Sequence, residues 1–156
     1  MSALPNLDLI VLAASNSYND GSDKKSTLDY WVNGYKTTIS DLQKYSDKII
    51  ILNDTPHPGI PTALDCLGKN LATPSICDMS ISQTVDQIDR MEALTQVSSQ
   101  NAIPIINPVP WLCYQSICPA VLDGIPAYVD GSHLSAQMSE RLAPLLEQSV
   151  LSKLNG

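Results

Sequence analysis

The hydrophobic pattern contains three continuous apolar runs, and each of them ends in polar residues. The runs cover residues 7–14, 48–53 and 102–107. Apolar runs of this length, without alternation, are typical of strands that are buried on both faces, as in parallel sheets. Pro104 interrupts the third run and cannot donate a ladder hydrogen bond, which favours a position near a sheet edge.

Helical spacing fills the intervals between these runs. Apolar residues recur at helical spacing over residues 27–45, with Gly34 as a weak point. A strand, a helix and a second strand in succession predict a right-handed βαβ unit. Ser80 and Gln83 fit a capping box, and a helix is expected over 81–100. The chain is therefore expected to adopt an α/β layer fold with parallel strands.

The end of the chain predicts one more helix. Ser135 is a credible N-cap, and Pro144 is expected to kink or divide the helix. The expected buried face consists of Leu134, Met138, Leu142, Leu145 and Leu146. Most of the prolines lie between residues 54 and 126, so we expect long loops over 54–78 and 108–126.

Polar residues gather where the expected strands end. In parallel sheets, sites form beyond the carboxyl ends of the strands. The loops at 15–21, 53–60 and 107–133 leave that edge, which predicts a single crevice. Its expected lining is Asn16, Asn53, Asp54 and the pair Asp130 and His133.

Asp130 and His133 are the strongest candidates for chemistry. They lie three residues apart on a tight turn with Gly131, just before the last helix. A carboxylate in this position would fix the imidazole tautomer, while the other ring nitrogen takes a proton from a nucleophile. The competing interpretation is that Asp130 only caps the turn and that His133 is an ordinary loop residue.

Composition limits the classes of partner. The chain has 156 residues, which suits one domain, and a formal net charge of -7 with no cluster of Lys or Arg. Nucleic acid and anionic membrane surfaces are therefore not expected as partners. No apolar run approaches the roughly 18 residues needed to cross a bilayer. The N-terminal residues have no signal-peptide pattern.

The four cysteines, Cys66, Cys77, Cys113 and Cys118, show no C-x-x-C spacing. An even number at loop positions favours two disulfides in an oxidising compartment. The two local pairs, Cys66–Cys77 and Cys113–Cys118, are the preferred pairing, and four reduced cysteines are the alternative. A metal site made of His57, Asp54, His133 and Asp130 is a weaker interpretation, since His57 is expected to be solvated in its Pro-rich loop.

Taken together, the motifs resemble the SGNH hydrolase superfamily. More narrowly, they are similar to the SGNH domain found behind the membrane-embedded acyltransferase-3 domain of bacterial O-acyltransferases. The similarity covers most of the chain, from about residue 7 to 147. The residues that carry it are Leu9–Ala14, Ile49–Pro56, Leu112-Cys113, Cys118-Pro119 and Pro126-x-Tyr128-x-Asp130-x-x-His133-Leu134-Ser135.

The resemblance implies a three-layer, flavodoxin-like fold of parallel strands as one SGNH-like domain over 1–156, incomplete at its N-terminus. Asp130 and His133 would be the acid and base of a Ser-His-Asp triad, acting through an acyl-serine. Asn16 lies where relatives place an oxyanion-hole or substrate-contacting residue; its alternative role is to form a turn. The resemblance implies no cofactor and no metal.

The resemblance also implies partners and a location. The substrates would be a small acyl donor and a sugar acceptor of cell-surface polysaccharide or peptidoglycan. The parent protein would carry a membrane acyltransferase domain, and this domain would lie outside the cytoplasm.

One departure from the family is important, because Gly-Asp-Ser occurs nowhere in the chain. Ser15 and Ser17 are the only candidate substitutes for the nucleophile, since Ser132 adjoins the base in sequence. We therefore expect a carboxyl-terminal portion of a longer protein, with little or no esterase activity by itself. A missing strand would leave an open sheet edge, through which the chain could dimerise.

The alternative function is a non-catalytic module that binds carbohydrate or a protein partner. Its stacking faces would be Tyr18, Trp31, Tyr114 and Trp111, although core packing is expected for the two tryptophans.

Overall fold

The computed structural model describes residues 6–13, 15, 27–59, 62–84 and 88–154. Two compact units divide the chain. The first, called the sheet unit, consists of Met1–Asn53, Gln87–Ile106 and Ser149–Gly156. The second, called the disulfide unit, consists of Asp54–Asp86 and Asn107–Gln148. The expectation of a single domain over 1–156 stays a prediction.

A parallel sheet forms the centre of the sheet unit. Its strands are β1 (Ile10–Ala13), β2 (Ile49–Leu52) and β4 (Ile105–Ile106), in the order β1-β2-β4. β2 pairs in parallel with both neighbours, Ile10 opposite Ile49 and Ile51 opposite Ile105. The expected parallel α/β fold is confirmed. β4 is shorter than expected and lies at an edge of the described sheet, as Pro104 indicated.

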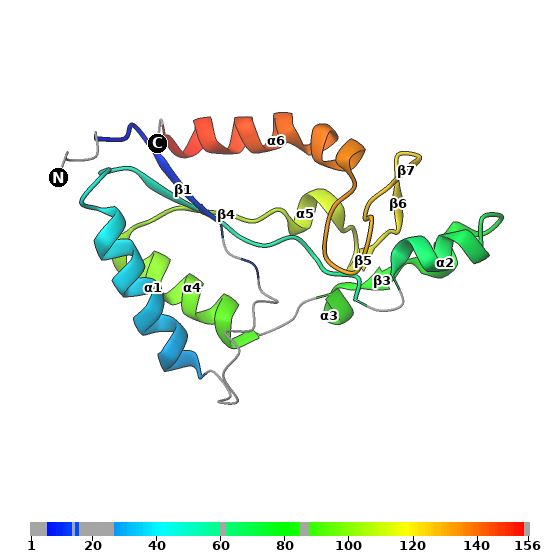
Figure 1. Cartoon of the computed structure of the whole chain (residues 1–156), viewed down its shortest axis with the longest axis horizontal. Coiled ribbons are helices and arrows are strands. Elements are labelled where there is room, and N and C mark those ends of the chain that lie inside the picture. Colours follow the sequence, from blue (N-terminus) through cyan, green and yellow to red (C-terminus); the bar gives the residue numbers. More distant parts are fainter. Residues whose placement is uncertain (1–5, 14, 16–26, 60–61, 85–87, 155–156) are drawn as a thin grey trace. The chain divides into compact units, whose positions relative to one another are not determined.

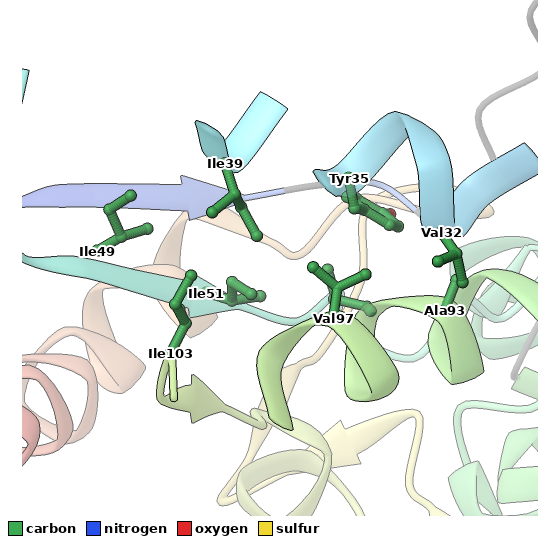
Figure 2. Packing of buried hydrophobic residues seen from close by; sticks show 9 residues of the cluster. Val32, Tyr35, Ile39, Ile49, Ile51, Ala93, Val97 and Ile103 are labelled. Atoms are coloured by element: carbon green, nitrogen blue, oxygen red, sulfur yellow. The ribbon is translucent and has the colours of Figure 1, made fainter. Parts of the chain in front are cut away.

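Two helices cover one face of this sheet. They are α1 (Leu28–Leu42) and α4 (Ile88–Asn101), which lie side by side in Figure 1. Thr27 caps α1 by accepting a hydrogen bond from the Tyr30 N–H. Figure 2 shows how their side chains meet those of the sheet; the labelled residues are Val32, Tyr35, Ile39, Ile49, Ile51, Ala93, Val97 and Ile103. Burying each large aliphatic side chain here contributes roughly 1.5–3 kcal/mol.

β1 is not buried on both faces, which corrects one expectation. Ile10 and Leu12 pack against the core, but Val11 points the other way and is 43% exposed. In the described sheet β1 is an edge strand and pairs with β2 alone. Leu7, just before the strand, is also exposed.

The disulfide unit contains short elements, most of them where long loops were expected over 54–78 and 108–126. They are α2 (Ala63–Lys69), a 3₁₀ helix (Pro74–Cys77), β3 (Met79–Ser80), α3 (Ile81–Thr84), α5 (Val109–Leu112), β5 (Ile117–Cys118), β6 (Val121–Leu122) and β7 (Ile125–Pro126). β3 pairs with β5 and β6 with β7, both antiparallel. The many prolines led to the prediction of loops. Each element is only two to seven residues long, which is too short for a hydrophobic period to be recognised in the sequence.

The helix expected over 81–100 is two helices, α3 and α4, and residues 85–87 lie outside the described part. Half of the expected capping box is present, since the Ser80 N–H donates to Gln83 Oε1 at 3.0 Å.

The last helix, α6 (Ala136–Leu154), begins as expected and continues through Pro144. Ser135 Oγ accepts a hydrogen bond from the Met138 N–H at 3.0 Å. Met138 and Leu142 are buried, but Leu145 is 39% exposed, which corrects the expected buried face.

Both expected disulfides, Cys66–Cys77 and Cys113–Cys118, are present, and no described cysteine is free. Among the described residues, no helix has the length and apolar character required to cross a membrane.

Candidate functional site

Asp130 and His133 lie at the tip of a tight chain reversal in the disulfide unit. Two antiparallel contacts close its base. The Ser135 N–H donates to the Ala127 carbonyl (2.9 Å), and the Val129 N–H donates to the His133 carbonyl (3.0 Å). Ala127 is buried at one end, and at the other end Ser135 caps α6. Both arms of the reversal are therefore anchored in the unit, while its tip faces solvent.

The carboxylate of Asp130 organises this tip. Its Oδ1 accepts hydrogen bonds from the N–H groups of Ser132 and His133, each at 2.8 Å. Its Oδ2 lies 2.8 Å from His133 Nδ1. The expected contact between acid and imidazole is thus present. Asp130 also caps the turn, and its role as the acid of a triad stays a prediction.

The electrostatics of the turn determine which ring nitrogen carries the proton. The N–H of Ser132, then the side chain and the N–H of His133, lower the pKa of Asp130 from 3.8 to about 2. Asp130 is therefore ionised at neutral pH and can only accept hydrogen bonds. It follows that His133 Nδ1 carries a proton and donates to Oδ2. In the neutral imidazole, Nε2 is then the basic nitrogen.

The imidazole is accessible, because the His133 side chain is 76% exposed and that of Asp130 is 48% exposed. Ser132 Oγ lies 3.4 Å from His133 Nδ1. That nitrogen is the one bound to the carboxylate, so Ser132 does not present its hydroxyl to the basic nitrogen. This agrees with the exclusion of Ser132 as nucleophile.

His57 was misjudged from the sequence. It is 5% exposed rather than solvated, and its Nε2 lies 3.0 Å from Asp54 Oδ2. The His57 N–H donates to the Thr84 carbonyl at 3.0 Å, which attaches the backbone at His57 to the end of α3. The sequence carried a signal for the contact between Asp54 and His57, though not for its burial, since the two residues have the same spacing as Asp130 and His133.

The two Asp–His pairs lie on segments that touch. The Gly59 N–H donates to the Gly131 carbonyl at 2.9 Å. A Cβ at Gly131 would lie 2.8 Å from the Gly59 carbonyl oxygen. The expected approach of the loop after β2 to the 130–133 turn is therefore present.

The structure does not test the other residues predicted around this site. Asn16 and Ser17 lie outside the described residues. Ser15 and Asn53 belong to the sheet unit, where the Asn53 N–H donates to the Ile106 carbonyl at 2.9 Å. The roles predicted for Asn16, Ser15 and Ser17 stay predictions.

The described residues contain no group of three or more His, Cys, Asp or Glu side chains that could hold a metal. The four residues of the metal interpretation form the two separate pairs described above.

The aromatic candidates fall into two groups. Trp31 packs against the core of the sheet unit and Trp111 against that of the disulfide unit, which confirms the core packing expected for both tryptophans. The Arg90 guanidinium lies 4.5 Å from the centre of the Trp31 ring. Tyr114 is 74% exposed, and Tyr18 lies outside the described part.

Comparison with known proteins agrees with the parallel α/β fold. A solved structure, the periplasmic domain of a lipopolysaccharide acetyltransferase from Salmonella ser. Paratyphi A, is similar with a TM-score of 0.67 and 17% sequence identity. The similarity covers 92% of this chain and 57% of that chain, so the chain spans little more than half the length of the Salmonella domain. At this identity the likeness concerns the fold alone. No curated protein matches the chain.

Comparison with protein families gives a match over nearly the whole chain. Residues 1–148 match the family described as "SGNH domain (fused to AT3 domains)". The match covers nearly the whole chain, and the parallel α/β fold agrees with it. The chain therefore belongs to the family of SGNH domains that are fused to AT3 domains.

Proposed function

We propose that this chain supplies the acid and base of a serine esterase or O-acyltransferase. The enzyme moves acetyl or other short acyl groups on or off sugar hydroxyls of cell-surface polysaccharide or peptidoglycan. The observation that carries the proposal is the 2.8 Å contact between Asp130 Oδ2 and His133 Nδ1 on an exposed turn. Family membership and the name of the Salmonella structure, a lipopolysaccharide acetyltransferase, support the reaction class.

In the proposed mechanism, His133 Nε2 takes the proton of a serine hydroxyl as the serine oxygen attacks the acyl carbonyl. Asp130 stabilises the imidazolium that forms. The imidazolium then gives its proton to the leaving group, and an acyl-serine remains. In the second half, Nε2 deprotonates a sugar hydroxyl or water, whose oxygen attacks the acyl-serine; the imidazolium returns the proton to the serine oxygen as its bond to the acyl group breaks.

The nucleophile is the component that this sequence does not provide in the family's form, because it contains no Gly-Asp-Ser. We place the serine on a segment outside the printed sequence, brought to the exposed imidazole in the parent protein. Exposure of His133 supports this arrangement, since a base that awaits its nucleophile has an open Nε2 side. The chain alone is then inactive.

The proposed location is outside the cytoplasm, as part of a membrane protein. Two disulfides support an oxidising compartment, and the family's fusion to AT3 domains supports a membrane-bound parent.

The test is acyl transfer by the polypeptide that carries this chain together with its Gly-Asp-Ser segment. We expect His133→Ala to lower kcat by roughly 10⁴- to 10⁶-fold, as the loss of a triad member does. Asp123→Asn is the matched control. It removes another exposed carboxylate of the same unit, which pairs with Arg141, and should leave the rate unchanged.

The isolated chain provides a second check, because it should not turn over p-nitrophenyl acetate. Turnover that disappears in His133→Ala would show a nucleophile within this sequence, with Ser15 and Ser17 as the candidates. The alternative, a glycan- or partner-binding module, predicts binding to acetylated polysaccharide with no effect of His133→Ala on transfer. Tyr114 is its exposed aromatic candidate.

A further inference from the structure

We propose that the buried Asp54–His57 pair is a brace that holds the Asp130–His133 turn in its hydrogen-bonding geometry. Asp54 and His57 are then positioning residues, and this role rests on the function proposed for Asp130 and His133. Asp54 and His57 act through the contact between Gly59 and Gly131.

The pair is placed for structure rather than for proton transfer. The side chains of His57 and Asp54 are 5% and 15% exposed, whereas those of His133 and Asp130 are 76% and 48% exposed. Asp54 also binds the opposite ring nitrogen, Nε2, at 3.0 Å. The nitrogen that would have to face a substrate is therefore the one that the carboxylate occupies. A buried pair of this kind is costly to break, because removal of one residue deprives the other, still buried, of this ion pair.

The same pair fixes the backbone around it. Asp54 Oδ1 accepts a hydrogen bond from the Thr55 N–H at 2.8 Å. The His57 N–H donates to the Thr84 carbonyl at 3.0 Å. Pro56, between them, is among the fully buried side chains. The segment 54–57 is thereby attached to the unit at several points.

Two residues further on, this segment meets the turn. Gly59 donates its N–H to the carbonyl of Gly131, which directly follows Asp130. The backbones approach so closely that a Cβ at Gly131 would lie 2.8 Å from the Gly59 oxygen. A shift of segment 54–59 must therefore move the turn, or break its hydrogen bond to Gly131.

The test measures the carboxyl pKa of Asp130 by NMR titration of the chain. This pKa is lowered to about 2 by three hydrogen bonds within the turn, so it reports the geometry of the turn. We expect His57→Ala and Gly131→Ala to raise it toward 3.8. His57→Gln, which can still donate to Asp54, should restore most of the shift. A loss of stability elsewhere in the protein would not produce this pattern.

Gly68→Ala is the matched control for Gly131→Ala. It lies in α2 of the same unit, and its Cβ would meet nothing within 4 Å. Asp130 should keep its low pKa in this variant. If the pKa stays at about 2 in folded His57→Ala, the brace does not exist. If His57→Ala does not fold, the result for Gly131→Ala decides in the same way.

Activity of the parent polypeptide provides a second readout. We expect His57→Ala to lower kcat by up to about 10²-fold with KM unchanged, as a misplaced catalytic group does. An unchanged kcat would overturn the brace. The proposed function fails by a different result, an unaffected rate in His133→Ala, so the two failures can be distinguished.

Discussion

The carboxylate of Asp130 links the proposed chemistry to acid stability. Its folded pKa of about 2 lies below the ordinary 3.8, so it stabilises the folded state above about pH 4. This contribution is lost as the pH falls toward 2. We expect the difference in unfolding free energy between the wild type and Asp130→Asn to shrink over that interval. Urea denaturation from pH 5 to pH 2 measures it, and a constant difference would contradict the assigned hydrogen bonds.

Tyr128 is the second residue with an unusual environment. It is 1% exposed, and its hydroxyl has no hydrogen-bond partner among the described residues. Burial raises the pKa of Tyr128, so the hydroxyl stays neutral. We expect Tyr128→Phe to stabilise the chain by about 1 kcal/mol, because it removes an unsatisfied polar atom. Denaturant unfolding measures the change.

Tyr35→Phe is the matched control for this substitution. The Tyr35 hydroxyl accepts a hydrogen bond from Arg90 Nε at 3.0 Å, so its removal should destabilise the chain. Destabilisation by Tyr128→Phe would mean that the Tyr128 hydroxyl has a partner.

At the scale of residues, contacts between neighbours in the sequence were predictable, and contacts with distant segments were not. The contact between Asp130 and His133 was predictable, because a carboxylate three residues before a histidine on a turn can reach it locally. The identical spacing at Asp54 and His57 gave no indication of burial. The His57 N–H donates to the Thr84 carbonyl, a contact with a distant segment that the local sequence does not specify.

Gly34 allows a direct test of helix propensity in α1. Gly34 lies in the middle of α1, and a Cβ there would meet nothing within 4 Å. Gly34→Ala should therefore stabilise the chain by roughly 0.5–1 kcal/mol through helix propensity. Thermal or denaturant unfolding checks the prediction. No stabilisation would mean that the surface around Gly34 is occupied.

At the scale of elements, long periodic or apolar segments were predictable and short ones were not. The parallel pairing of β1 and β2, which α1 connects in the chain, was predictable from two apolar runs with helical spacing between them. The short helix α2 arises from features with no period, such as the Thr62 N-cap and the burial of Ala63 and Leu67. The exposure of Val11 depends on what covers its face of the sheet, which the apolar run does not encode.

For the whole molecule, the edge strand β1 predicts self-association. Its apolar Val11 is 43% exposed, and exposed apolar edges favour pairing between chains. We expect the isolated chain to form dimers that depend on concentration, and Val11→Lys to weaken them. Leu71→Lys, at an 80% exposed position outside the sheet, is the control. A monodisperse monomer in size-exclusion chromatography would contradict the prediction.

The whole account depends on one imidazole in one tautomer. The chain has only two histidines, so a nitrogen-15 NMR spectrum of the side chains contains two imidazoles, and His57→Gln assigns them. With the imidazole neutral, we predict that His133 carries its proton on Nδ1 and leaves Nε2 bare, and that Asp130→Asn abolishes this preference. A proton on Nε2 of His133 in the wild type, or a tautomer unaffected by Asp130→Asn, would contradict the assignment of these residues as acid and base.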